Sequence, residues 1–183
     1  NFLLNNLRDI ERTGDIRSYK KDLVDLYVNR DQHSFSTQVT DLDNIQNPSI
    51  HSLLSSKYHE AQMHRLNIHA EIPDPVIHNY LTDLDLAVVL GHLMDNAIDG
   101  ARKASEGFIS LAYFDEEDCQ SFIIESTIAD EQMPLSMMST RLSHPEGGIG
   151  VNAVQDILER YPNTSFSVRS QNHKMMQILE MRP

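Results

Sequence analysis

The sequence has one cysteine, Cys119, and no tryptophan among its 183 residues. A single cysteine cannot form an internal disulfide, which suits a reducing compartment. The nine histidines and the cysteine show no spacing typical of a zinc site. No signal peptide is evident, and no apolar run approaches the roughly 20 residues that a membrane span needs. We therefore expect neither a disulfide-stabilised nor a zinc-dependent fold, although a soluble fragment of a membrane protein would share these features.

Positive charge is also scarce, because 15 lysines and arginines stand against 27 acidic residues, a formal net charge of −12. Such a surface repels phosphate backbones and anionic lipids, so we expect no nucleic-acid binding. Hydrophobic residues make up 40% of the chain, which favours a packed core over disorder. This length suits one ordinary domain with a small helical element added.

The N-terminal region, residues 1–29, predicts two short helices joined by a turn at 13–15. Each helix carries one apolar stripe, formed by Phe2, Leu3, Leu7 and Ile10 in the first and by Ile16, Tyr19, Leu23, Leu26 and Tyr27 in the second. Two such helices cannot bury their stripes alone, so we predict a hairpin that pairs with a second copy of itself. Residues 30–47 are polar without a clear period and indicate a linker. We therefore expect a partial dimerisation hairpin and linker over 1–47, and a separate domain over 48–183.

The second region alternates between helical and strand-like patterns. Helices are predicted from Pro48 to about Tyr58, over 83–104 and over 151–160. Strands are predicted over 66–72, 108–114, 121–125, 165–170 and 175–181, with an acidic turn at 115–118 and an irregular stretch at 127–147. This order predicts an α/β fold, a two-layer sandwich in which helices pack on one mixed sheet.

The helix predicted over 83–104 divides into two faces. Its apolar arc consists of Leu86, Val89, Leu90, Leu93, Ala97 and Ala101, and its polar arc consists of His92, Asn96, Asp99 and Lys103. Asparagine is a weak helix former in mid-helix. An amide oxygen one turn from a carboxylate is a reasonable set of ligands for Mg²⁺ and phosphate. The same side chains could equally be a solvated surface, and spacing alone does not separate the two interpretations.

A glycine-rich segment, Glu146-Gly147-Gly148-Ile149-Gly150-Val151, precedes the helix predicted over 151–160. Glycines let backbone N–H groups approach a ligand closely, and a helix N-terminus attracts anions. Most turns of this kind are ordinary connections between a loop and a helix. The order of an asparagine-bearing helix, two strands, an irregular loop and then glycines strengthens the phosphate-binding interpretation.

These segments resemble a known family. The segment Leu90–Ala101 resembles the N box of the GHKL ATPases, the group that holds gyrase, Hsp90, histidine kinases and MutL. Gly148-Ile149-Gly150-Val151 resembles the core of that group's later glycine box. The strand at 66–72 and the prolines after it resemble the entry to this domain in peptide-pheromone receptor kinases of the Agr and Com type. Residues 1–7 resemble the segment just after the phosphorylated histidine of those kinases.

The resemblance implies a Bergerat-type sandwich, as in histidine-kinase ATPase domains, preceded by a partial helical hairpin. It further implies ATP and Mg²⁺ as cofactors, phosphorylation of a histidine, and phosphate transfer to a response regulator. The expected partners are a second copy, through the N-terminal helices, and that regulator. We expect a membrane connection only through a missing N-terminal sensor region, with this part on the cytoplasmic side of a bacterial plasma membrane. The acceptor histidine would lie four residues before Asn1, so we expect no autophosphorylation by this chain alone.

The resemblance also assigns roles to residues. Asn96 would hold Mg²⁺ and act in catalysis together with Asp99, which would orient the metal's waters or the attacking group. Gly148 and Gly150 would bring backbone amides to phosphate oxygens. Further nucleotide contacts are expected at His92, Lys103, Ser126, Asp130 and Arg141.

Several positions depart from the family pattern. His92 stands where asparagine is frequent, Asp99 where glutamate is usual, and Ser126 where the receptor kinases carry asparagine. The Asp-x-Gly-x-Gly box is absent, and Glu146 replaces the first glycine of the later box. These departures keep an alternative open, a degenerate kinase-like module that dimerises and docks a partner without turnover. A gyrase- or MutL-like ATPase acting on DNA is disfavoured by the acidic charge and the short chain.

Overall fold

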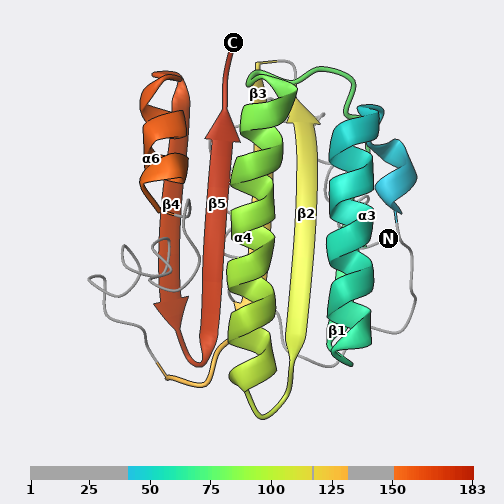
Figure 1. Ribbon diagram of the computed structural model, residues 1–183, viewed down its shortest axis with the longest axis vertical. Helices are drawn as coiled ribbons and strands as arrows, with labels where there is room; N and C mark the ends of the chain where they lie inside the picture. The colour runs from blue at the N-terminus through green and yellow to red at the C-terminus, as the bar shows by residue number, and fades with distance from the viewer. Residues whose placement is uncertain (1–40, 117, 132–150) are drawn as a thin grey trace, which may run out of the picture. The chain divides into compact units, whose positions relative to one another are not determined.

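The computed structural model describes residues 41–116, 118–131 and 151–183 (Figure 1). The chain divides into two compact units, Asn1–Gln38 and Val39–Pro183, and the described residues all belong to the second unit. The hairpin predicted over 1–29 therefore lies outside the described residues. So do three of the predicted site residues, Arg141, Gly148 and Gly150.

The elements follow the order that the sequence predicts. A short 3-10 helix, η1 (Asp41–Asn44), leads to α3 (Pro48–Met63) and β1 (Asn67–Glu71). The long helix α4 (Asp83–Lys103) is followed by the hairpin of β2 (Phe108–Glu116) and β3 (Cys119–Thr127). Helix α6 (Val151–Glu159) and the strands β4 (Thr164–Gln171) and β5 (Lys174–Met181) complete the unit.

The five strands form one mixed sheet in the order β1-β2-β3-β5-β4. Strand β1 runs parallel to β2, and the other neighbouring pairs are antiparallel. The helices α3, α4 and α6 lie side by side over one face of the sheet (Figure 1). The two-layer α/β sandwich predicted from the sequence is confirmed. Its centre is β3, which is buried at every position, whereas the edge strand β4 alternates between half-buried and exposed residues.

Helix α4 lies over the middle of the sheet, and its sequence explains its bounds. The Thr82 side chain caps its start by accepting from the backbone N–H of Asp85. Acidic residues in the first turn and basic residues in the last turn both suit the helix dipole. All six residues of the predicted apolar arc are buried. Met94 and Ile98 are buried as well, because α4 packs against α3 in addition to the sheet.

The segment before α3 differs from the prediction. Leu42 and Ile45 are buried in the main core, and Ile45 forms a parallel bridge with Val76. The backbone N–H of Val76 donates to Asn44 O at 2.9 Å, and that of Gln46 donates to Val76 O at 3.0 Å. The linker predicted over 30–47 is therefore wrong for residues 41–45. Periodicity could not reveal this pairing, because the partner segment lies some 30 residues further along the chain.

No helix in the described part of the chain is both long and apolar enough to cross a membrane.

Candidate functional site

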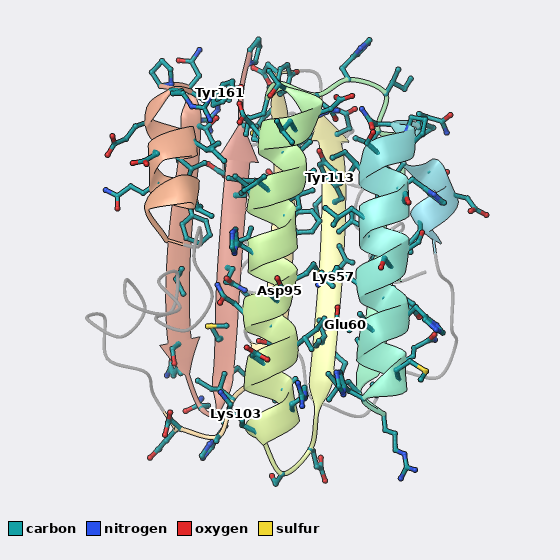
Figure 2. All side chains as sticks on the ribbon, in the orientation of Figure 1. Lys57, Glu60, Asp95, Lys103, Tyr113 and Tyr161 are labelled. Carbon is teal, nitrogen blue, oxygen red and sulfur yellow. The ribbon has the colours of Figure 1, made fainter. Side chains whose placement is uncertain are left out.

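The polar arc of α4 lies away from the core, as predicted. His92, Asn96 and Asp99 are half-buried, and Lys103 is exposed in the last turn of the helix (Figure 2). Asn96 and Asp99 are three residues apart and so share one helix face. Arg102 Nη1, in the next turn of the helix, lies 3.9 Å from Asp99 Oδ1, so this carboxylate already faces a positive charge.

The other acid in this stretch, Asp95, is directed elsewhere. Lys57 of α3 points toward it (Figure 2), and the Lys57 Nζ atom lies 2.5 Å from Asp95 Oδ1 and 2.8 Å from Glu60 Oε2. Burial lowers the pKa of Lys57, but its hydrogen bonds to the two carboxylates outweigh burial and raise the pKa overall. Asp95 therefore ties α4 to α3 and does not belong to the polar arc.

Ser126 lies beneath α4 at the end of β3. Its side chain is fully buried, and its hydroxyl has no hydrogen-bond partner among the described residues. A Cβ atom added at Gly100 would stand 3.9 Å from Ser126 Oγ and 3.1 Å from Ile128 Cγ2. The backbone of α4 thus comes very close to the strand at Gly100, the residue next to Asp99. Ser126 is paired in register with Met175, which packs with Ile128 in a small apolar cluster.

Ser126 therefore lies close to Gly100, which directly follows Asp99 in α4, and Asn96 stands one turn back along the helix. His92 stands one further turn back on the same arc. Asp130 is exposed just past the end of β3.

Sequence reasoning missed a cluster around Asp85, at the opposite end of α4. The Tyr161 hydroxyl donates to Asp85 Oδ2 at 2.6 Å, and Arg160 Nη2 lies 2.8 Å from Asp85 Oδ1. The backbone N–H of Thr82 donates to the Tyr161 hydroxyl at 3.2 Å. The hydrogen bond from Tyr161 is the main reason that the pKa of Asp85 is lowered, with Thr82 and Arg160 adding to it against burial.

This cluster fastens the C-terminal end of α6, where Tyr161 is seen in Figure 2, to the start of α4. Helix α6 is the helix that follows the predicted glycine segment. Its orientation therefore depends in part on a contact between residues that are 75 or 76 positions apart. The sequence signal for this contact is an Arg-Tyr pair at the end of the predicted helix, which by itself points to no particular partner.

The donor set suits a metal that is shared with a ligand. Within the residues that the structure describes, no group of three or more His, Cys, Asp or Glu could hold a metal ion. Mg²⁺ bound with phosphates usually takes one or two protein oxygens and completes its shell with phosphate oxygens and water. Asn96 and Asp99 fit that arrangement, because they offer two oxygen donors on a half-buried surface.

Comparison with known proteins identifies the family. Residues 81–182, from the start of α4 to the end of β5, match a family described as GHKL domain. Comparison with curated proteins gives no match. Among solved structures, the nucleotide-free catalytic domain of the histidine kinase ThkA is similar, with a TM-score of 0.60 and 14% identity over 74% of this chain and 92% of that one.

Two other solved structures show the same likeness. The Acinetobacter baumannii histidine kinase AdeS aligns with a TM-score of 0.55 and 16% identity, covering 73% of this chain and 62% of that chain. ThkA in complex with the response regulator protein TrrA aligns with a TM-score of 0.58 and 14% identity, covering 75% of this chain and 40% of that chain. Identities this low demonstrate a common fold, and the match over 81–182 supplies the family. The chain belongs to the GHKL domain family, and its fold is that of the catalytic domains of histidine kinases.

Proposed function

We propose that this chain is the ATP-binding catalytic region of a two-component sensor histidine kinase. The observation that carries the proposal is the polar arc of α4, where Asn96 and Asp99 stand half-buried beside the close contact of Gly100 with β3. Membership of the GHKL domain family supports the same conclusion. The region would phosphorylate a histidine and would pass the phosphate to a response regulator.

In this proposal the residues of the chain bind and position the nucleotide. Asn96 would hold Mg²⁺, which supplies charge neutralisation at the phosphates when bound, and Asp99 would orient the metal's waters or the attacking group. The backbone at Gly148 and Gly150 would contact phosphate oxygens, with Arg141 adding positive charge. His92, Lys103, Ser126 and Asp130 would complete the nucleotide contacts. The contribution to rate would come mainly from orientation and electrostatic complementarity.

The proposed setting is a membrane receptor kinase of the Agr and Com type, with this region on the cytoplasmic side and dimerisation through the N-terminal helices. The pattern of residues 1–7 and 66–75 supports that subfamily. The complex of ThkA with its response regulator TrrA supports a partner of the same class here.

The test is the Asn96→Ala variant, titrated with a non-hydrolysable ATP analogue. Losing a contact to a charged partner costs about 1.5–3 kcal/mol, so affinity in Mg²⁺ should fall by about tenfold or more. Without Mg²⁺ the two proteins should differ much less. Folding should be nearly unchanged or slightly more stable, by up to about 0.7 kcal/mol, because alanine is the better helix former.

The matched control is Asp95→Asn, which changes the neighbouring residue on the α3 side of the helix. It should leave nucleotide affinity as in the wild type. Equal binding of Mg²⁺–nucleotide by wild type and Asn96→Ala would refute the role assigned to Asn96. A large loss of thermal stability in that variant would instead place Asn96 in the core.

A second candidate function is a non-catalytic, kinase-like module that dimerises and docks a partner. It is favoured by Ser126, because this fully buried side chain stands at a position where the receptor kinases carry asparagine. Absence of nucleotide binding to the wild-type chain, with or without Mg²⁺, would favour this candidate over the kinase.

A further inference from the structure

Strand β4 forms one edge of the sheet, with β5 as its neighbour (Figure 1). Its eight residues pair with β5 one to one from Thr164 to Gln171, so no bulge interrupts the strand. Natural proteins commonly protect edge strands from other chains with charges, prolines, bulges or short strands. Strand β4 contains no proline and a single charged residue, Arg169, so these devices protect it little.

The backbone of β4 presents every second residue to this edge. The N–H of Arg182 donates to Asn163 O at 3.2 Å, and such bonded pairs recur at every second residue of an antiparallel ladder. The odd-numbered residues of β4 therefore bond to β5, and the N–H and C=O groups of Phe166 and Val168 point outward. Among the described residues, no backbone group of another element bonds to either of these two. The outer edge of β4 can therefore accept a further strand.

A second copy of β4 complements this edge when it runs antiparallel about a two-fold axis at Ser167. The outward groups of Phe166 then meet those of Val168 in the second copy, and the contact occurs twice by symmetry. An aromatic side chain opposite a β-branched one is a favourable cross-strand pair. On the other face of the sheet, Arg169 stands opposite Ser165 of the second copy, so no two like charges meet.

Charge favours the same register. Arg169 is exposed, and Ser165 is paired with Glu180 of β5. In the joined sheet, Arg169 would lie two strand spacings, about 10 Å between Cα atoms, from Glu180 of the second copy. Two extended side chains can bridge that distance, and the two-fold axis forms the ion pair twice. The contacts of Glu180 within its own chain, to Ser165 at 3.2 Å and Arg182 at 3.4 Å, are compatible with this addition.

Helix α6 leaves room for the second copy. It lies over the end of β4 that begins at Thr164 (Figure 1), and its nine residues span about 14 Å. The eight residues of β4 span about 27 Å. A two-fold axis at Ser167 places α6 of the second copy over the opposite end of the paired strands, so the two helices do not overlap.

We propose that β4 pairs with β4 of a second copy of this chain, antiparallel about Ser167, and joins two sheets into one. This inference is independent of the proposed kinase function and of the N-terminal helices.

The experiment measures association of the full chain by sedimentation equilibrium, with thermal melts to confirm that each variant folds. Ser167→Lys adds a charge at an exposed position, and only pairing about the axis brings the two lysines face to face. We expect it to weaken the association by about tenfold or more. The matched control is Ser56→Lys, which adds the same charge at an exposed position of α3 and should leave the association unchanged.

A charge exchange tests the register. Arg169→Glu should weaken the association by about tenfold, and adding Glu180→Arg to it should restore the association to within about threefold of the wild type. Hydrogen exchange at the Phe166 and Val168 amides should slow as the wild-type concentration rises, which pairing elsewhere would not cause.

A wild-type chain that stays monomeric up to about 1 mM would overturn the proposal. Association that is unchanged in Ser167→Lys, or that leaves exchange at Phe166 and Val168 unaltered, would place the contact on another surface and would also overturn it. A double variant no tighter than Arg169→Glu would refute the register.

Discussion

The cluster around Asp85 provides the sharpest prediction about stability, through the variant Tyr161→Phe. This change removes one hydroxyl and keeps the aromatic ring. The hydroxyl donates at 2.6 Å to a carboxylate whose side chain is only 11% exposed. Hydrogen bonds to charged groups contribute about 1.5–3 kcal/mol, and short charge-assisted bonds belong to the stronger ones. The hydroxyl also accepts from the backbone N–H of Thr82. Because that amide is exposed, it can hydrogen-bond to water once the hydroxyl is removed.

The ion pair between Arg160 and Asp85 should contribute less to stability than the Tyr161 hydrogen bond. The Arg160 side chain is 59% exposed, and pairs of that kind contribute about 0–1 kcal/mol. We therefore expect Tyr161→Phe to lose about 1.5–3 kcal/mol and Arg160→Met less than about 1 kcal/mol. For a unit of this size, about 2–4 °C of melting temperature corresponds to 1 kcal/mol, so Tyr161→Phe should melt roughly 3–12 °C lower.

The dependence on pH supplies a second readout of the same cluster. The pKa of Asp85 is lowered in the folded protein, chiefly by the Tyr161 hydrogen bond. Its stabilising contribution is therefore present above the ordinary aspartate pKa of about 3.9 and is lost as pH falls through the lowered folded value. The wild type should exceed Asp85→Asn in stability at neutral pH, and the gap should close below about pH 4.

Urea unfolding between pH 3 and pH 8, together with thermal melts, measures both effects. A Tyr161→Phe variant as stable as the wild type would refute the reasoning, and so would an Arg160→Met variant that loses more than Tyr161→Phe. A gap between wild type and Asp85→Asn that persists unchanged to pH 3 would show that its source is packing and not the charge.

Three further predictions concern α4 and the residues that contact it. Gly91→Ala should raise the free energy of unfolding by up to about 1 kcal/mol, because a Cβ there meets only Leu53 Cδ1, at 3.9 Å, and alanine favours the helix. Gly107→Ala should lower the free energy of unfolding by about 1–3 kcal/mol, because its Cβ would overlap the Leu66 side chain and stand 3.0 Å from a backbone oxygen. Equal urea midpoints for the Gly91→Ala and Gly107→Ala variants would contradict both predictions. Lys57→Met should cost less than about 1 kcal/mol, because its partner Asp95 is 50% exposed. Because the pKa of Lys57 is raised in the folded protein, its contribution to stability persists at neutral pH and fades above about pH 10.4. If Lys57→Met loses stability only under acid conditions, the ion pair is excluded as the source of the loss.

Local patterns predicted most of the fold correctly. The helix period separated the buried and polar faces of α4, because a single helix keeps its stripe wherever it packs. Alternation and turn residues located all five strands, with ends within a few residues of those observed. The resemblance at residues 90–101 pointed to the family that the match over 81–182 confirms. The roles of Asn96, Asp99 and the glycines remain predictions.

Contacts between segments far apart in the chain were decided only by the tertiary structure. Neither the bond from Tyr161 to Asp85 nor the bridge from Ile45 to Val76 has a periodic signature, because each joins residues about 30 or more positions apart. The position of β5 between β3 and β4 likewise depends on which strand of the β4–β5 hairpin pairs with β3. Sequence patterns report on one element at a time, so they located the polar arc of α4. The close approach at Gly100 that sets Ser126 beneath that arc exists only once helix and sheet have packed.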